Sequence, residues 1–226
     1  MGNSFQTSLQ MNLRQIDFPF SQYIREEHQK KQIYLHHTAG NPNGVGTFGW
    51  WQSNPERVAT CVAISGKGNN CVDGEIIQGF SSRYWAYHLG IKPITFKGFN
   101  LPVLQLDKIS IGIEICNWGQ LSEVNGKFYT YTGKEINQDE VIELDNPYKG
   151  FRYFHSYTEK QINSVRDLLL LWNNKYGITL DYNEDIWKVC PRALRGENGV
   201  FTHNSVRVDK VDIYPHPLMI QMLKSL

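Results

Sequence analysis

Hydrophobic and polar positions alternate in one segment near the middle of the chain, Ser110 to Cys116 (SIGIEIC). Three isoleucines take every second position there, and Glu114 lies between the last two of them. Successive side chains of a β-strand point to opposite faces of the sheet, so the segment is predicted to be a strand. The isoleucines would then face one side of the sheet and the Glu114 carboxylate the other.

Apolar runs of strand length recur in four other places: Lys31–His37, Val58–Ser65, Cys71–Phe80 and Trp85–Leu89. The first run enters a segment rich in Gly, Asn and Pro, which we expect to be a loop from Thr38 to Gly49. Only Gly66–Asn70 separates the second run from the third, and this spacing indicates a hairpin. The fourth run could add a further strand to the sheet.

Helical periodicity is strongest in the last third of the chain, where apolar residues form a stripe: Ile162, Val165, Leu168, Leu169, Trp172 and Tyr176. Thr158 and Gln161 have the spacing of a capping box before this stripe, and Gly177 is a typical stop after it. We interpret the stripe as a core face rather than a surface that binds a partner. A shorter helix is predicted from Pro217 to Leu226, with its proline in the first turn.

Two segments lack a clear period. Trp118 to Phe154 is polar and aromatic, has turn signals at Asn125-Gly126 and Gly133, and is expected to be a loop or hairpin. Cys190 to Asp212 is rich in Gly, Arg and Asn. Several strands followed by a helix predict an α/β fold, with a mixed central β-sheet flanked by helices. The length fits a single domain over residues 1–226, with residues 1–30 as an N-terminal extension.

The charges are nearly balanced, with 23 basic and 22 acidic side chains and a formal net charge of +1. No broad basic field is implied, so neither nucleic acid nor an anionic membrane is an expected partner. Met1 to Asn12 is polar, and no apolar stretch has the length of a signal peptide or of a membrane span. We therefore expect a protein that is cytoplasmic at synthesis and does not insert into membranes, with a monomer as the simplest oligomeric state.

The four cysteines, Cys61, Cys71, Cys116 and Cys190, contain no CxxC pair. A disulfide between Cys61 and Cys71 could bridge the predicted hairpin. Reduced, packed thiols are the alternative, and the cytoplasmic compartment favours them because disulfides are rare there.

Four polar features lie outside the predicted core: the pair His36-His37, His88, Glu114, and the segment His203–Asp212. Histidines and a carboxylate brought together from separate elements are what an open zinc site needs, with three protein ligands and a fourth position for water. Adjacent strand residues face opposite sides, so only one of His36 and His37 can reach such an ion, and the pattern does not decide which. Ordinary packing is the alternative reading of each histidine.

Five segments in order carry a family resemblance: Tyr34–Gly40 (YLHHTAG), Trp85–Gly90 (WAYHLG), Ser110–Glu114 (SIGIE), Tyr157–Gln161 (YTEKQ) and Thr202–Pro215 (THNSVRVDKVDIYP). Together they resemble the zinc-dependent N-acetylmuramoyl-L-alanine amidases, the family that includes T7 lysozyme-type amidases and peptidoglycan recognition proteins. The likeness extends from about residue 31 to residue 217. It implies the fold of that family and hydrolysis of the amide bond between N-acetylmuramic acid and L-alanine.

The resemblance also implies roles for individual residues. His36, His203 and Asp212 would be the ligands of Zn²⁺, and Glu114 would be the general base. Lys210 would face the substrate carbonyl. His88 and Trp85 would contact the peptidoglycan or muropeptide substrate.

Two departures from the family pattern stand out. Thr60 occupies a position where some members carry a catalytic Tyr, which puts more of the acid role on Glu114. Asp212 is followed by Ile213-Tyr214-Pro215, where the family usually has Pro-Gly after this aspartate.

Three functions stay open at this point. The first is a wall-degrading amidase, such as a phage or prophage endolysin or a bacterial cell-wall enzyme. The second is a cytoplasmic amidase that recycles soluble muropeptides, and the third is a peptidoglycan-binding module without catalysis. In any of them the insertion at residues 118–154 could wall the substrate groove or pack on itself. Its candidate contacts are Tyr129, Tyr131, Tyr148, Tyr153 and Phe154.

Overall fold

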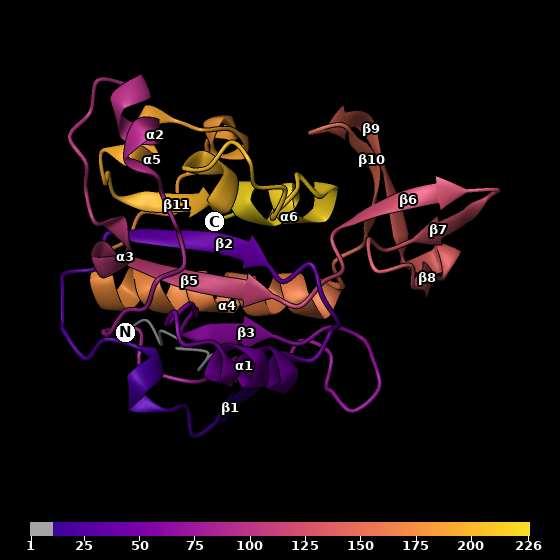
Figure 1. The fold of residues 1–226 in the computed structure, drawn as a ribbon, viewed down its shortest axis with the longest axis horizontal. Coiled ribbons are helices and arrows are strands. Elements are labelled where there is room, and N and C mark those ends of the chain that lie inside the picture. Colours follow the sequence, from indigo (N-terminus) through magenta and orange to yellow (C-terminus); the bar gives the residue numbers. More distant parts are fainter. Residues whose placement is uncertain (1–10) are drawn as a thin grey trace, which may run out of the picture.

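A six-stranded sheet forms the centre of the computed structural model, which describes residues 11–226 (Figure 1). In spatial order its strands are β1 (Leu13–Gln15), β4 (Ile76–Gln78), β3 (Val62–Ile64), β5 (Ser110–Ile115), β2 (Gln32–His37) and β11 (Gly199–Thr202). Only the β3–β4 pair is antiparallel, and the other neighbours are parallel. The predicted mixed central sheet is therefore confirmed.

The register of the middle strands brings the functional candidates onto one face. His36 of β2 lies directly beside Glu114 of β5, and Ala63 of β3 lies beside Glu114 on the other side. The three isoleucines of β5 alternate with Glu114 and are at most 2% exposed. As predicted, these isoleucines belong to the core, and Glu114 points to the opposite face.

Helices flank the sheet on both sides. The long helix α4 (Glu159–Tyr176) runs behind β5 and contacts α6 (Pro217–Lys224), whereas α1 (Gly44–Ser53) lies in front of β3 (Figure 1). The Thr158–Gln161 capping box is present, and Gly177 ends α4 in the left-handed conformation that favours glycine. Shorter helices connect the strands: η1 (Phe20–Gln22), α2 (Pro93–Gly98), α3 (Leu106–Ile109), η3 (Glu184–Trp187), α5 (Pro191–Leu194) and η4 (His203–Ser205).

Helix α1 corrects the prediction of a loop over Thr38–Gly49. Its glycines each cost about 1 kcal/mol of helix propensity relative to alanine, which hides the helix in the sequence. Burial of Phe48 and Trp51 overrides that propensity. Gly44 also has a packing reason, because a Cβ atom there would lie 2.8 Å from the Ile77 side chain. The Asn43 side chain caps the helix by accepting a hydrogen bond from the Gly46 amide.

Two further predictions are corrected. Trp85–Leu89 is not a strand but makes isolated bridges, between Trp85 and Ile24 and between Tyr87 and Val58. The Gly/Arg/Asn-rich segment from Cys190 contains the strand β11, which pairs in parallel with β2. Four residues are too few to show a period in the sequence, and the strand is stabilised by pairing with its neighbour.

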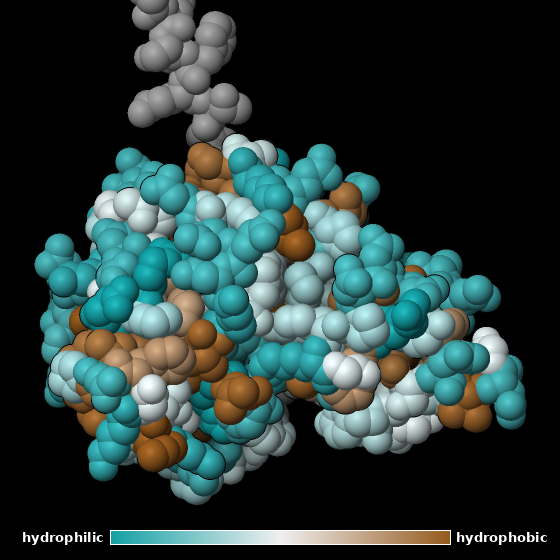
Figure 2. Space-filling model, turned by 90° about the horizontal axis from the view of Figure 1, so that it is seen from above, coloured by the Kyte–Doolittle hydropathy of each residue, from teal (hydrophilic) through white to brown (hydrophobic). Residues whose placement is uncertain are grey.

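The insertion folds as a second, antiparallel sheet rather than a loop or a single hairpin. Its strands in spatial order are β8 (Glu135–Ile136), β7 (Lys127–Tyr129), β6 (Gln120–Val124), β10 (Phe151–His155) and β9 (Val141–Tyr148), with η2 (Gln138–Glu140) before β9. The predicted turn at Asn125-Gly126 joins β6 to β7, and both residues have the positive φ that such turns require. Figures 1 and 2 show this sheet as a lobe beside the main body.

The described part of the N-terminal extension joins the main sheet. Strand β1 pairs with β4, and Phe18 and Tyr23 are buried in the core. All four cysteines lie within the described residues 11–226 and are free thiols there. Cys61 and Cys71 are therefore not joined by a disulfide. Within the same residues, no helix combines the length and the hydrophobicity that crossing a membrane requires.

Two buried histidines, His155 and His216, are expected to make the stability of the fold sensitive to acid. His155 is 9% exposed and His216 is 2% exposed, and burial lowers the pKa of each to about 4. Above pH 6.5 both are neutral in the folded and the unfolded chain, so they leave stability unchanged. Between about pH 6.5 and 4 only the unfolded chain takes up protons, so the free energy of unfolding falls by about 3 kcal/mol per histidine.

Urea unfolding at a series of pH values measures this effect. His216→Gln removes one titrating group and should reduce the loss of stability between pH 6.5 and 4. A variant with the same pH dependence as the unsubstituted protein would contradict the assignment.

Candidate metal centre and active site

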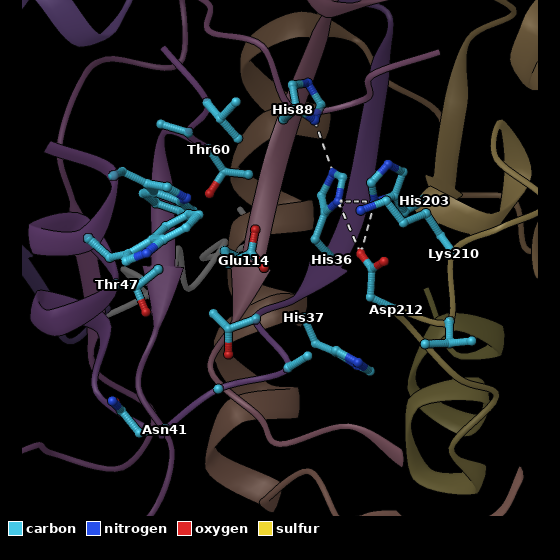
Figure 3. Close-up of a pocket in the computed structure, with 18 of the residues that line it drawn as sticks. His36, His37, Asn41, Thr47, Thr60, His88, Glu114, His203, Lys210 and Asp212 are labelled. Carbon is cyan, nitrogen blue, oxygen red and sulfur yellow. Dashed lines mark hydrogen bonds and ion pairs between the residues drawn. The ribbon is translucent and has the colours of Figure 1, made fainter. Parts of the chain in front are cut away.

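Three side chains from distant parts of the chain meet at the carboxyl end of β2. The Nδ1 atoms of His36 and His203 are 3.1 Å apart, and the Asp212 Oδ2 atom lies 2.9 Å from His203 Nδ1 and 3.5 Å from His36 Nδ1. Figure 3 shows the three side chains pointing toward one another. Candidate ligand atoms of this trio all lie within 4.8 Å of one another.

The spacing and the orientation of these atoms fit a tetrahedral zinc ion. Zinc bound at about 2.0–2.1 Å by nitrogen and oxygen would have its ligand atoms about 3.3 Å apart, close to the three distances here. His203 Nε2 donates a hydrogen bond to the Leu89 carbonyl over 2.9 Å. This leaves the Nδ1 of a neutral His203 without a proton and facing the cluster, as a metal ligand requires.

The electrostatics favour a neutral His36 imidazole beside an ionised Asp212 carboxylate. Burial, and after it the neighbouring His203, lowers the pKa of His36 to about 4. Burial would raise the pKa of Asp212, but His203 and His36 outweigh it and hold that pKa well below its usual range. These are the protonation states in which both residue types bind a metal.

Glu114 and Lys210 border the same cluster. Glu114 is half-buried on β5, beside His36. Burial, reinforced by Asp212, raises the pKa of Glu114 well above its usual range, and the Lys210 ammonium opposes this shift. In Figure 3 the Lys210 side chain extends from its loop toward the cluster.

The loop that carries Lys210 and Asp212 is fixed from two sides. The Asn204 side chain donates hydrogen bonds to the carbonyls of Asp212, at 2.9 Å, and Ile213, at 2.6 Å. On the other side Lys149, in the β9–β10 turn of the insertion, donates to the carbonyls of Val208, at 3.0 Å, and Lys210. The altered sequence after Asp212 therefore does not move it out of the cluster.

The three ligand candidates, Glu114 and Lys210 all line one cavity of about 640 Å³. It is bounded by β2 and β5, by α1, by the loop from Asp209 to Asp212, and by Tyr131 of the insertion. Two aromatic side chains are widely exposed in its walls, Trp50 of α1 at 61% and Tyr131 at 69%. The cavity can therefore hold a ligand with apolar faces next to the polar cluster.

Residues 26–217 match the model of the family described as N-acetylmuramoyl-L-alanine amidase. The chain belongs to this amidase family. This match confirms the resemblance seen in the five motifs. It also confirms the predicted enzyme class, an amidase of peptidoglycan.

Solved structures show the shared fold of this amidase. PlyL is 18% identical, with 95% of this chain and 98% of PlyL covered and a TM-score of 0.52. The PlyG catalytic domain is 15% identical, with 95% and 94% covered and a TM-score of 0.50. No curated protein matches the sequence.

Three other residues that the sequence singled out in this amidase lie outside the ligand trio: His37, Trp85 and Thr60. His37 is turned away from the trio, and its Nδ1 atom is 2.7 Å from the Tyr157 hydroxyl, which separates the two members of the histidine pair. Trp85 is 6% exposed and does not line the cavity, and the Lys108 ammonium lies over its ring in a cation–π contact. It is therefore not placed to contact a substrate in this cavity. Thr60 lines the cavity, but its hydroxyl donates to the Val62 carbonyl.

Several residues at the site of this amidase were not predicted from the sequence. Trp50 lies in α1, directly after the segment Thr38–Gly49 that was expected to be a loop. Asp107 and Ser110 contact His88. Asp107 belongs to none of the five motifs, and Ser110 opens the SIGIE motif but was given no role of its own. Asp107 had one available signal, because a carboxylate placed just before an apolar strand is costly to bury unless it accepts hydrogen bonds.

Proposed function

We propose that this protein hydrolyses the amide bond between N-acetylmuramic acid and L-alanine in peptidoglycan, and that it does so with zinc held by His36, His203 and Asp212. The convergence of these three ligand atoms carries the proposal. Two neutral imidazoles and one carboxylate would leave a bound Zn²⁺ with a net charge of +1, which suits a Lewis acid. Family membership supports the substrate class.

Zinc bound at this trio would act as a Lewis acid and lower the pKa of water to about 7. Glu114 takes the proton of the attacking water and returns it to the leaving amine of L-alanine, because its carboxylate lies on β5 directly beside the His36 ligand and lines the same cavity. The Lys210 ammonium stabilises the negative charge that develops on the carbonyl oxygen. Thr60 cannot replace a catalytic Tyr as an acid, because its hydroxyl is already donated to a backbone carbonyl.

The substrate extends from the cluster between α1 and the insertion. We propose that Trp50 and Tyr131 pack against the sugar and the stem peptide there, because both are exposed in the cavity walls. Of the five aromatic candidates in the insertion, Tyr131 is the one that lines the cavity. The insertion thus walls the groove through its β7–β8 turn and braces the Lys210 loop through Lys149.

Tyr131→Ala should raise KM roughly three- to tenfold with little change in kcat, the equivalent of about 1 kcal/mol of binding, because it removes a contact made equally before and during reaction. Tyr129→Ala is the matched control from the same insertion, outside the cavity. Steady-state kinetics on a soluble muropeptide measure both parameters. An unchanged KM for Tyr131→Ala would contradict this role.

Cleavage of the wall polymer is the form of the activity that we propose, as in an endolysin or a bacterial cell-wall amidase. The aromatic walls are open to solvent, so a polymeric strand can reach the cluster. Parallel assays on purified sacculi and on soluble anhydro-muropeptides test this. Turnover of the soluble fragments alone would instead indicate a recycling amidase. Binding of sacculi without turnover of either substrate by the zinc-loaded protein would indicate a binding module and overturn the proposed enzyme.

A further inference from the structure

We propose that His88 and Asp107 form a positioning network that orients both histidine ligands of the site, and that His88 acts through His36 rather than on the substrate. This inference rests on the zinc site of the proposed function. It replaces the substrate-contact role that the family resemblance implies for His88.

Both ring nitrogens of His88 are already engaged within the protein. Its Nδ1 atom lies 3.0 Å from His36 Nε2, and its Nε2 atom lies 2.9 Å from the Ser110 hydroxyl oxygen. A neutral His36 that presents a bare Nδ1 to the metal carries its proton on Nε2 and donates it to His88 Nδ1. His88 then carries its own proton on Nε2 and donates it to Ser110. No ring nitrogen of His88 is left for a substrate.

The next residue along the chain orients the second imidazole. The Leu89 carbonyl accepts the hydrogen bond from His203 Nε2 that turns His203 Nδ1 toward the cluster. His88 and Leu89 therefore hold one histidine ligand each, one through a side chain and the other through the backbone. A shift of this two-residue segment would turn both imidazoles at once.

Asp107 fixes the segment in place. Its side chain is buried, and one carboxylate oxygen accepts hydrogen bonds from the amides of His88, at 2.9 Å, and Leu89, at 3.0 Å. The other oxygen accepts from the Gln105 side chain at 2.9 Å. These bonds also explain why Trp85–Leu89 is not a strand, because the amides of its last two residues are directed to a carboxylate instead of a neighbouring strand.

Strand β5 makes room for the network. Ser110, Gly112 and Glu114 alternate on the face that carries His36. A Cβ atom at Gly112 would lie 3.0 Å from His88 Nδ1 and 2.5 Å from the Thr60 methyl group. Glycine at this position therefore lets the His88 ring lie against the strand, within reach of Ser110 on one side and His36 on the other.

Zinc affinity, measured by competition with a chromophoric chelator, tests the network on the full chain. His88→Phe removes the acceptor for His36 and should weaken zinc binding 10- to 100-fold, the usual effect of losing a group that orients a metal ligand. His88→Gln keeps a carbonyl oxygen that can accept from His36 and should recover most of the affinity. Asp107→Ala should weaken zinc binding similarly, and Asp107→Asn, which can still accept from both amides, should recover it.

Two results would overturn the network. One is unchanged zinc affinity together with a raised KM in His88→Phe, since that pattern belongs to a substrate contact. The other is an equal loss in His88→Phe and His88→Gln with a lower melting temperature of the zinc-free protein, since that pattern belongs to simple packing.

A readout that needs no metal separates this inference from the proposed function. Nitrogen NMR of the zinc-free protein reports which ring nitrogen of each histidine carries the proton. The network predicts the proton of both His36 and His88 on Nε2, and a loss of this preference at His36 in His88→Phe. A His36 proton on Nδ1 in the unsubstituted protein would overturn the network. Failure of that protein to bind zinc, with the predicted tautomers present, would overturn the proposed function alone.

Discussion

Glu114→Gln should lower kcat about 10²- to 10⁴-fold and leave zinc binding unchanged, since removal of a general acid–base group has an effect of this size. Glutamine has nearly the shape of glutamate but cannot take a proton from water. It also keeps the packing beside His36, which matters because the side chain is half-buried against β2. The ligand trio does not include Glu114, so the metal should stay in place.

The experiment combines zinc content with steady-state kinetics. Glu143→Gln is the matched control, because Glu143 is exposed in the insertion and pairs with Arg152 away from the cavity. The control should retain full activity. Loss of zinc together with activity in Glu114→Gln would reassign this residue to metal binding, and near-normal kcat would remove it from catalysis.

His203→Ala should abolish both zinc binding and activity. His203 is the central member of the trio, with its Nδ1 atom 3.1 Å from His36 and 2.9 Å from Asp212. Its removal leaves two ligands and takes away one of the two histidines that hold the pKa of Asp212 low against the effect of burial. We expect zinc affinity to fall more than about 100-fold, beyond the range seen when only an orienting group is lost.

Chelator competition measures this loss, and circular dichroism checks that the variant is folded. His28→Ala serves as the control, because His28 lies outside the ligand trio and the cavity. Full zinc occupancy with unchanged affinity in His203→Ala would refute the ligand assignment. Activity without zinc would refute the proposed role of the metal.

The strongest sequence predictions concern elements whose side-chain pattern repeats over several turns or residues. The alternating isoleucines of β5 predict both its strand and the face on which Glu114 lies, and the structure confirms both. The apolar stripe of α4 and its caps at Thr158 and Gly177 predict that helix within one residue at each end. In both cases burial against the sheet agrees with the local preference of the residues.

The elements that were missed are those in which packing overrides local preference. Gly44 and Gly46 lower the helix propensity of α1, so the sequence does not indicate a helix there. Glycine is nevertheless needed at position 44, because a side chain would clash with Ile77. Strand β11 is too short to show an alternating pattern of apolar and polar residues. It forms because its backbone pairs in parallel with β2. The insertion has turn signals, but its sheet depends on contacts between distant residues, such as the pairing of Gln120 with Phe154, which local patterns do not contain.

At the site, the sequence alone could not separate His36 from His37, because both follow the same apolar run. The structure separates them by direction, with His36 in the ligand trio and His37 bonded to Tyr157. The hydrogen bonds from the backbone amides of Leu89 and His88 to Asp107 could not be predicted either, since the partners are 18 and 19 residues apart in the sequence. Family motifs indicate which residues can react, whereas the groups that orient them become visible only in three dimensions.

The most direct test of the account is to identify the bond that the zinc-loaded protein cuts in purified sacculi. We predict new amino termini of L-alanine, released together with intact glycan strands, and loss of this product when a chelator removes zinc. Release of reducing sugar ends, or of amino termini from other stem residues, without new L-alanine termini would contradict it.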